Sequence, residues 1–235
     1  MSPRVLDAEG RPRLLDLFCG AGGCTKGYQE AGFYVVGVDV KPQPNYCGDE
    51  FHQADALEFL TYELPEFDAI HASPPCQNQS TLKARWQDRE HPELIGETRE
   101  LLEATGLPYV IENVEGAKAV LREPTMLCGT TFGLPLRRHR LFETNFPLMS
   151  PGCSHGAWPA RFDVYEHGKW RKTAFVPVYG YGGGKEREAG PAAMGIDWMN
   201  RAELTQAIPP AYTRFIGEQL MALIDQPTKE GSRHG

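Results

Sequence analysis

The chain has 235 residues, 41% of them hydrophobic and 23% charged, a composition typical of one medium-sized globular domain. Its net charge of −7 excludes a polybasic coat protein for nucleic acid, but it is compatible with a local basic groove. No apolar run approaches the roughly 18 residues that a membrane span needs, and the start of the chain lacks the apolar core of a signal peptide. The six cysteines form no C-x-x-C pair, so we expect reduced thiols in a soluble, cytoplasmic protein.

Apolar runs and helical segments alternate along most of the chain, and this alternation predicts an α/β fold. Buried strands are predicted at 13–18, 33–39, 67–72 and 109–114. Helices are predicted at 25–31, 56–62, 93–104, 203–208 and 212–224. Nearly continuous apolar strands separated by helices are typical of a parallel sheet covered on both faces, so we expect a doubly wound, Rossmann-like sheet.

One segment, 146–195, departs from this alternation. It is rich in Pro, Gly and aromatic residues and has no long periodic helix. Short strands are predicted around 175–179, followed by a flexible glycine tip at 180–184. We therefore expect three parts, namely an α/β domain over 1–145, a small irregular region over 146–195, and C-terminal helices over 196–235 that return to the first domain.

Three glycines, Gly20, Gly22 and Gly23, stand between the first predicted strand and the first predicted helix. Glycine permits a sharp turn and close approach of a ligand, and a helix N-terminus offers free N–H groups. Asp39 ends the next strand, where a carboxylate can accept hydrogen bonds from ribose hydroxyls. The spacing is G-x-G-G and not G-x-G-x-x-G, so this motif by itself fits a nucleoside-bearing cofactor and a plain tight turn equally well.

A cysteine lies just beyond the strand predicted at 67–72. Cys76 follows two prolines, which restrain the backbone at the carboxyl end of the sheet, where α/β proteins bind ligands. Most cysteines of this kind are buried and structural. Cys76, however, has Ser, Pro and Gln as neighbours, and a thiolate is a strong nucleophile when its pKa is lowered.

A carboxylate interrupts the apolar strand predicted at 109–114. Glu112 needs a partner or a function there, because an unpaired buried charge costs several kcal/mol. Arg138 and Arg140 alternate, so on an extended segment they share one face with Leu136 while His139 points away. A structural ion pair and a solvated run of charges remain the commoner explanations for such residues.

Taken in order, four motifs resemble those of the DNA cytosine-5 methyltransferase family. Asp-Leu-Phe-Cys-Gly-Ala-Gly-Gly at 16–23 resembles the family's S-adenosylmethionine loop, and Pro-Pro-Cys-Gln at 74–77, with Ser80, resembles its catalytic loop. Glu-Asn-Val at 112–114 resembles the catalytic glutamate motif, and residues 132–142 resemble the Q-x-R-x-R element. Four ordered motifs make the resemblance specific. It implies the S-adenosylmethionine-dependent methyltransferase fold.

The resemblance also implies an activity, the transfer of a methyl group from S-adenosyl-L-methionine to C5 of cytosine in double-stranded DNA. Cys76 would bond to C6 of a cytosine flipped out of the duplex, and Glu112 would hold its N3. Arg140 would bind the cytosine O2. Arg138 would brace Glu112 and the catalytic loop.

The same resemblance assigns cofactor contacts. Phe18 would pack on the adenine, Asp39 would bind the ribose hydroxyls and Asp55 the adenine amine. The remaining cofactor contacts fall on Gly20, Gly22, Gly23 and Pro74.

Contacts with DNA are expected from two basic segments. The segment 78–92 follows the cysteine and would close over the flipped base. DNA contacts from the catalytic loop are expected at Gln77, Ser80, Lys83 and Arg85. Residues 137–172 carry seven Lys and Arg against three Asp and Glu, which predicts a modest, salt-sensitive affinity for phosphates. We expect a monomer that uses 146–195 as its target-recognition region.

Three departures from the family pattern leave other functions open. Leu136 replaces the Gln of Q-x-R-x-R, Gln206 replaces an Asn near the C-terminus, and the target-recognition region is short. The alternatives are cytosine-5 methylation of RNA, a DNA-binding relic without turnover, and transfer of a bulkier group.

A metal site is the least favoured feature. Cys128, Cys153 and His155 offer three ligands, but the C-x-H spacing of the last two fits no familiar structural zinc pattern. We therefore expect no bound metal.

Overall fold

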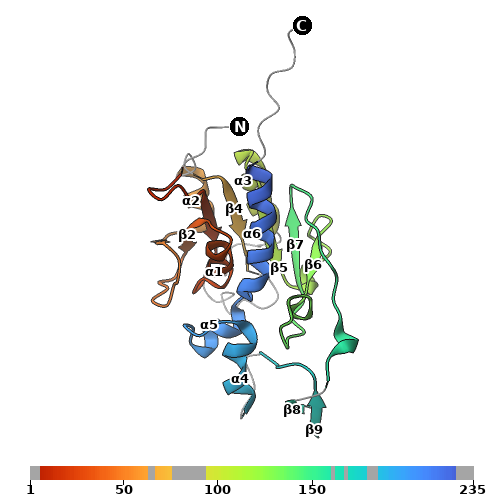
Figure 1. Cartoon of the computed structure of the whole chain (residues 1–235). Helices are drawn as coiled ribbons and strands as arrows, with labels where there is room; N and C mark the ends of the chain where they lie inside the picture. The colour runs from red at the N-terminus through yellow and green to blue at the C-terminus, as the bar shows by residue number, and fades with distance from the viewer. Residues whose placement is uncertain are drawn as a thin grey trace, which may run out of the picture.

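The computed structural model of the chain describes residues 6–62, 67–75, 94–159, 162–166, 169–178 and 185–225. A seven-stranded sheet with the order β3-β2-β1-β4-β5-β7-β6 forms its centre, and a two-stranded sheet pairs β8 with β9 (Figure 1). The strands are β1 Arg13–Leu17, β2 Tyr34–Asp39, β3 Glu50–Gln53, β4 Ala69–Ala72, β5 Tyr109–Asn113, β6 Thr125–Leu127, β7 Arg140–Thr144, β8 Phe162–Glu166 and β9 Lys169–Thr173. The helices are α1 Gly23–Glu30, α2 Ala56–Tyr62, α3 Leu94–Thr105, α4 Lys185–Met194, α5 Arg201–Gln206 and α6 Pro210–Ile224, with short 3₁₀ turns η3 Glu115–Ala117, η4 Gly129–Phe132 and η5 His155–Ala157.

Strand direction confirms the expected doubly wound sheet and adds one reversed strand. The pairs β2–β3, β1–β2, β1–β4 and β4–β5 are parallel. In contrast, β7 runs antiparallel to both β5 and β6. The amino end of β7 therefore meets the carboxyl end of β5, and Glu112 lies opposite Phe142.

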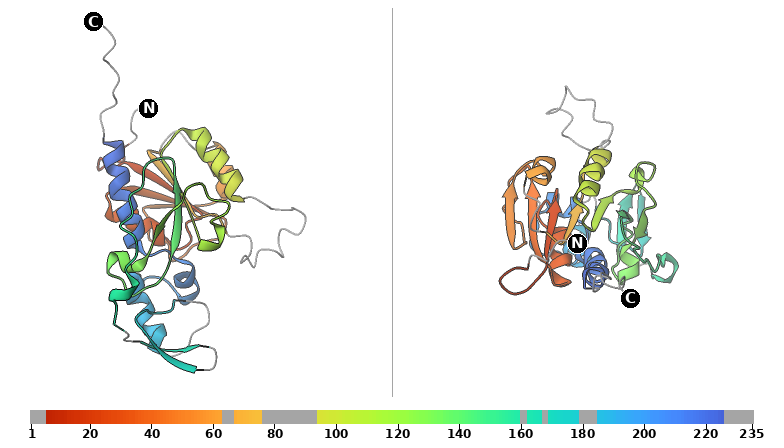
Figure 2. Two further views of the ribbon diagram at one scale, coloured as in Figure 1. Left: turned by 90° about the vertical axis from the view of Figure 1, so that its right-hand side faces the viewer. Right: turned by 90° about the horizontal axis from the view of Figure 1, so that it is seen from above.

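Successive residues of each strand enter two different cores, because side chains alternate across a sheet. Leu15, Val36, Ile70 and Ile111 pack with α2 and α3 in one core. The residues just before them in the chain, Leu14, Val35, Ala69 and Val110, pack with α1 and α6 in the other core. The two helical layers lie on opposite faces of the sheet in the view from above (Figure 2). Both faces of the central strands are thus covered, which explains their continuous apolar sequences.

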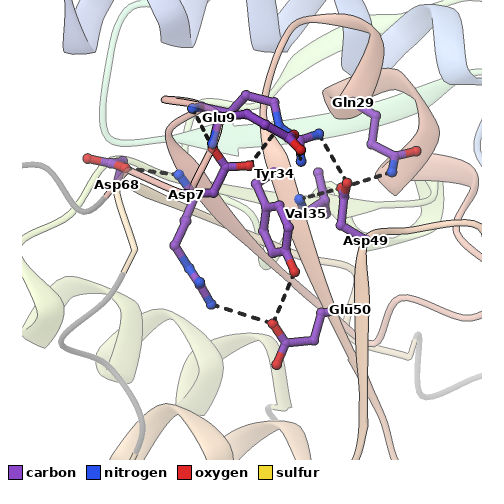
Figure 3. Close-up of polar contacts among 10 residues, drawn as sticks. Asp7, Glu9, Gln29, Tyr34, Val35, Asp49, Glu50 and Asp68 are labelled. Atoms are coloured by element: carbon purple, nitrogen blue, oxygen red, sulfur yellow. Dashed lines mark hydrogen bonds and ion pairs between the residues drawn. The ribbon is translucent and has the colours of Figure 1, made fainter.

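Polar contacts join neighbouring elements at the amino end of the sheet (Figure 3). The Asp49 carboxylate accepts hydrogen bonds from the Val35 N–H at 2.9 Å and from Gln29 Nε2 at 2.9 Å, so it joins β2 to α1. The Asp68 carboxylate accepts from the Arg13 N–H at 3.0 Å, which joins the start of β4 to β1. These contacts align the first strands at the end of the sheet away from the motifs at its carboxyl edge.

The segment 146–195 contains more regular structure than its sequence predicts. The sequence predicts no long periodic helix here, and the structure has α4, a helix of 10 residues with Pro191 inside it. Ala193 and Met194 of α4 are buried against Val176 and Val178, and this packing outweighs the local preference of Pro against a helix. Figure 1 shows α4, α5 and the β8–β9 hairpin together beyond the carboxyl edge of the sheet.

The strands of this region lie elsewhere than predicted. Residues 174–178 form no strand, because Pro177 has no N–H, and Val176 donates a single hydrogen bond to the Pro135 carbonyl. The strands are instead β8 and β9, and the predicted tip at 180–184 lies outside the described residues.

The other predicted elements match the structure closely, with shifts at their ends. The α5 helix starts earlier than predicted because Asn200 and Glu203 form a capping box, and α6 starts at Pro210, a residue suited to the first helical position. The short strands β3, β6 and β7 were not predicted. In the part of the chain that the structure describes, no helix combines the length and apolarity needed to cross a bilayer.

Candidate active site

The glycine turn between β1 and α1 lies beside Asp39. Gly20 and Gly22 have φ angles of 51° and 87°, a left-handed backbone that glycine adopts at little cost. The Gly20 N–H donates to Asp39 Oδ2 at 3.1 Å. A Cβ added to Gly20 would meet no atom within 4 Å, so among the described residues the space beside Gly20 is open, whereas a Cβ on Gly22 would lie 2.8 Å from Cys47 Sγ. The turn and the carboxylate form one unit at the carboxyl edge of the sheet.

Phe18 enters this turn with a strained backbone. Its φ is 59°, a conformation that costs a residue with a Cβ about 1–2 kcal/mol. Its ring packs against the core formed with α2 and α3. Backbone strain of this kind concentrates at functional sites, because surrounding structure must hold it in place.

Gly23 has a different role, which is close packing. A Cβ there would lie 2.7 Å from the Ile208 carbonyl oxygen, so the start of α1 touches the backbone that leads into α6. Trp198 Nε1 also donates to the Ala21 carbonyl at 2.9 Å. The C-terminal part of the chain therefore supports the turn directly.

Asp55 lies at the start of α2, next to β3. Its Oδ1 accepts from the Leu57 N–H at 2.9 Å and the Glu58 N–H at 3.2 Å, which caps the helix. The Ala54 N–H donates to the Asp39 carbonyl at 3.1 Å, so Asp39 and Asp55 come from adjacent strand ends. The carboxylates of Asp39 and Asp55, both predicted to bind the cofactor, therefore lie at the same end of the sheet, where β2 and β3 end.

The predicted catalytic loop begins beside β5. Asn113 Nδ2 donates to the Pro74 carbonyl at 2.8 Å in a buried position. This bond holds the Pro74–Pro75 segment to the end of the strand that carries Glu112. The loop residues predicted to act on the base or DNA lie outside the described residues, namely Cys76, Gln77, Ser80, Lys83 and Arg85.

Glu112 is paired with Arg140. The Arg140 Nε lies 3.1 Å from Glu112 Oε1, and both side chains are largely buried. Burial raises the pKa of Glu112, while Arg140, a hydrogen bond with Ser73 and Arg138 act in the opposite direction. The net effect is upward, so this carboxyl group holds a proton more readily than an exposed one.

Arg138 is buried and joins two distant segments. Its Nη1 donates to the Val178 carbonyl at 3.1 Å and its Nη2 to the Thr205 carbonyl at 2.7 Å. The charge of Arg138 also acts on Glu112, because it lowers the pKa of that carboxyl group. Arg138 connects the segment after β9 to α5.

The two residues that depart from the family motifs, Leu136 and Gln206, have different surroundings. Leu136 is buried in an apolar cluster with Val176, Val178 and Leu204. Leu136, which stands where the family motif has Gln, therefore extends this hydrophobic cluster. Gln206 ends α5, one residue after the Thr205 carbonyl that binds Arg138.

Asp16 belongs to the motif at 16–23, but it is not among the predicted site residues. It is fully buried, and burial raises its pKa to about 7, with smaller upward effects of Asp39 and Glu112. Oδ2 accepts from the Thr25 hydroxyl at 2.5 Å, whereas Oδ1 has no hydrogen-bond partner among the described residues. The signal was an acidic residue inside an apolar strand, the same signal that identified Glu112.

Sequence comparison finds the same family as the motifs. Residues 13–126 match the model of the C-5 cytosine-specific DNA methylase family. The type II methyltransferase M.FnuDI of Fusobacterium nucleatum is 36% identical over 74 residues, which are 29% of this chain and 22% of that protein. The type II methyltransferase M.NlaIV of Neisseria lactamica is 26% identical over 188 residues, which are 63% of this chain and 44% of that protein. The matches thus span less than half the length of these relatives.

Solved structures share the fold over most of the chain. The Dnmt2 methyltransferase of S. pombe superposes with a TM-score of 0.57 at 13% identity, covering 92% of this chain and all of that one. A prophage-encoded protein of E. coli, described as a DNA modification methyltransferase, gives a TM-score of 0.55 at 15% identity with the same coverage. Residues 13–126 are therefore similar to the C-5 cytosine-specific DNA methylase family, and most of the chain shares its fold with the two solved structures.

Proposed function

We propose that this chain methylates C5 of cytosine in double-stranded DNA and that Cys76 is its nucleophile. The observation that carries the proposal is the Glu112–Arg140 pair, which lies next to the Asn113 bond to the Pro74 carbonyl. Cys76 follows Pro74 by two residues, so its loop starts at the buried acid–base pair. A nucleophile and a proton-sharing acid are the two groups that activation of a cytosine ring requires.

In the proposed reaction, Cys76, Glu112 and Arg140 each have a separate role. The Cys76 thiolate forms a bond to C6, and the electron pair of the C5–C6 double bond becomes available at C5. Glu112 shares its proton with N3, which offsets the negative charge that develops on the ring, and Arg140 holds both Glu112 and the cytosine O2. After C5 has accepted the methyl group, its proton leaves to a base and the bond between Cys76 and C6 breaks.

S-adenosylmethionine would supply an electrophilic methyl group. The residues present fit such a cofactor, since among the described residues the space beside Gly20 is open and Gly20 lies next to Asp39. Phe18 would pack on its adenine, while Asp39 and Asp55 would bind its ribose and base. Gly22, Gly23 and Pro74 would line the site through their backbone.

The region 146–195 is proposed to recognise the target sequence. Its β8–β9 hairpin and α4 extend beyond the carboxyl edge of the sheet, at the same end as the proposed reaction site (Figure 1). Arg138 ties this region to α5 through the Val178 and Thr205 carbonyls. The predicted loop contacts of Gln77, Ser80, Lys83 and Arg85 would complete the binding of DNA.

The test is transfer of labelled methyl from S-adenosylmethionine to DNA that carries no modified cytosine. The purified chain is incubated with this DNA, and nucleosides are separated by mass spectrometry. We expect 5-methyldeoxycytidine with the unmodified chain and none with Cys76→Ala. DNA that contains 5-fluorocytosine should form a stable covalent adduct only when Cys76 is present.

The other functions give different results in the same assay. Label in structured RNA but not in duplex DNA would assign the activity to RNA. Binding of DNA without label or adduct, by protein with an unchanged melting temperature, would identify a binding relic. A deoxycytidine with a different added mass would keep Cys76 as the nucleophile and change the donor.

A further inference from the structure

Four metal-ligating side chains converge beside the proposed active site. They are Cys128, His139, Cys153 and His155, and one ligand atom from each lies within 4.8 Å of all the others. We refer to these four residues as the Cys2His2 cluster. They come from distant segments, because Cys128 precedes η4, His139 precedes β7, His155 begins η5, and Cys153 lies two residues before it. The fold therefore adds His139 to the three ligands that were visible in the sequence.

The distances within the Cys2His2 cluster suit a tetrahedral ion. His155 Nε2 lies 3.3 Å from Cys128 Sγ and 3.2 Å from His139 Nε2. A zinc ion bound at about 2.3 Å from sulfur and about 2.0–2.1 Å from nitrogen would separate its ligand atoms by about 3.3–3.8 Å. The two imidazole rings are nearly parallel, at 17° and 5.1 Å between centroids, and their Nε2 atoms are the atoms in contact.

The neighbouring groups orient the ligands. Glu115 Oε1 lies 3.0 Å from His139 Nδ1, which favours a proton on Nδ1 and leaves the Nε2 lone pair directed into the cluster. Thr130 Oγ1 accepts from the Ser154 N–H at 3.3 Å, so its own hydroxyl proton is available to Cys128 Sγ at 3.2 Å. A carboxylate on a ligating histidine and a donor to a thiolate are typical outer partners of protein metal sites.

We propose that the Cys2His2 cluster binds one Zn²⁺ with a structural role. Two thiolates and two imidazoles satisfy all four positions of tetrahedral zinc and leave none open for a substrate. The four ligands would join the segment that leads into the β8–β9 hairpin to the residue between Arg138 and Arg140. The ion would thus hold the recognition region in register with the arginines, and this proposal departs from the expectation of no metal.

The C-x-H spacing of Cys153 and His155 did not predict a zinc site, because the other two ligands are distant in the sequence. Cys153 is exposed and Cys128 is buried, so the cluster lies at the surface with one ligand accessible for metal entry. The inference does not depend on the proposed methyltransferase activity. It stands on ligand geometry and on the two neighbouring groups.

The first test is the metal content of the whole chain, expressed with added zinc and purified without chelator. Mass spectrometry of the metals should find about one zinc per chain for the unmodified protein. Cys153→Ser and His155→Ala should each lower this at least about fivefold. Cys47→Ser is the control, since Cys47 is a half-buried free cysteine whose Sγ donates to the Gly22 carbonyl, outside the cluster.

The second test replaces zinc with Co²⁺ and reads the ligands by absorbance. We expect the visible bands of tetrahedral cobalt and a charge-transfer band from thiolate. Cys153→His should keep the tetrahedral bands and lose part of the charge-transfer band, which a merely structural cysteine would not do. Addition of a chelator should lower the melting temperature of the unmodified chain by about 5 °C or more, and that of Cys153→Ser by much less.

Either of two results would overturn the proposal. One is a purified, folded chain with less than about a tenth of a zinc per molecule and no cobalt bands. The other is a disulfide between Cys128 and Cys153, detected as two missing thiols that return on reduction. Unchanged metal content in Cys153→Ser together with His155→Ala would also exclude this cluster as the site.

Discussion

Arg140 Nε lies 3.1 Å from Glu112 Oε1, at the point where the amino end of β7 meets the carboxyl end of β5. The pair is largely enclosed, so the charge of each residue is compensated by the other and not by water. Arg140 thereby limits the upward shift that burial causes in the pKa of Glu112. A carboxyl group balanced in this way can donate a proton and take it back within one reaction cycle.

The first prediction concerns Glu112. Glu112→Gln keeps the shape but removes the exchangeable acid, so methyl transfer should fall by about 100-fold or more. Glu103→Gln is the matched control, because Glu103 is an exposed carboxylate on α3 that pairs with Arg122 at 2.6 Å. Initial rates with labelled S-adenosylmethionine measure both variants. Equal rates for Glu112→Gln and the unmodified chain would remove Glu112 from the mechanism.

The second prediction concerns Asn113 as a positioning residue. Asn113→Ala releases the Pro74 carbonyl, so formation of the 5-fluorocytosine adduct should slow by about 10-fold or more. Asn145→Ala is the matched control, because Asn145 Nδ2 donates to the Leu107 carbonyl at 2.8 Å near the opposite end of β5. Both variants should lose stability, but only Asn113→Ala should slow adduct formation. If both slow it equally, the effect is one of stability alone.

The third prediction compares neighbouring arginines. Arg138→Ala leaves the Val178 and Thr205 carbonyls without their guanidinium donor and should lower the free energy of unfolding by about 2–4 kcal/mol. Arg137 is exposed, so Arg137→Ala should change it by no more than about 0.5 kcal/mol. Urea denaturation followed by circular dichroism gives both values. A stable Arg138→Ala variant would mean that the region after β9 is held by other contacts.

The fourth prediction is a pH dependence that originates at Asp16. Its pKa is raised from 3.8 to about 7, so between these values the native state binds a proton that the unfolded state has lost. The free energy of unfolding should therefore fall as pH rises from about 4 to about 7, by an amount on the order of a few kcal/mol. Asp16→Asn keeps an acceptor for Thr25 and should remove this fall. Denaturation curves at several pH values in this range test the difference. Parallel curves for the two proteins would contradict the assignment to Asp16.

Much of the fold could be predicted from the chain because its central strands are buried on both faces. Leu14 and Leu15 enter opposite cores, so the strand reads as a continuous apolar run, a pattern that local sequence reveals. The β7 strand could not be recognised in this way, because its apolar run is only Leu141 and Phe142, between Arg140 and Glu143. Glu143 is buried because Arg99 of α3 donates to it with Nε at 2.5 Å and Nη2 at 2.8 Å, and the Arg122 N–H at 2.7 Å.

The same limit applies to the candidate site. Alternation predicts His139 on the side away from Arg138 and Arg140, and in the structure its Nδ1 lies 3.0 Å from Glu115 Oε1. It did not reveal that Cys128 and His155 lie beside His139, because their approach depends on how β6, β7 and η5 pack. The roles of the residues in the catalytic loop stay predictions.

Three consecutive residues before and within the reversed strand β7 serve three different neighbours. Arg138 binds the carbonyls of Val178 and of Thr205 in α5, His139 belongs to the Cys2His2 cluster, and Arg140 pairs with Glu112. An insertion or deletion of one residue here would exchange all three partners at once, since adjacent side chains point in opposite directions. In a library of random variants selected for function, this tripeptide should therefore admit few substitutions and no change of length, while the exposed Arg137 next to it varies freely.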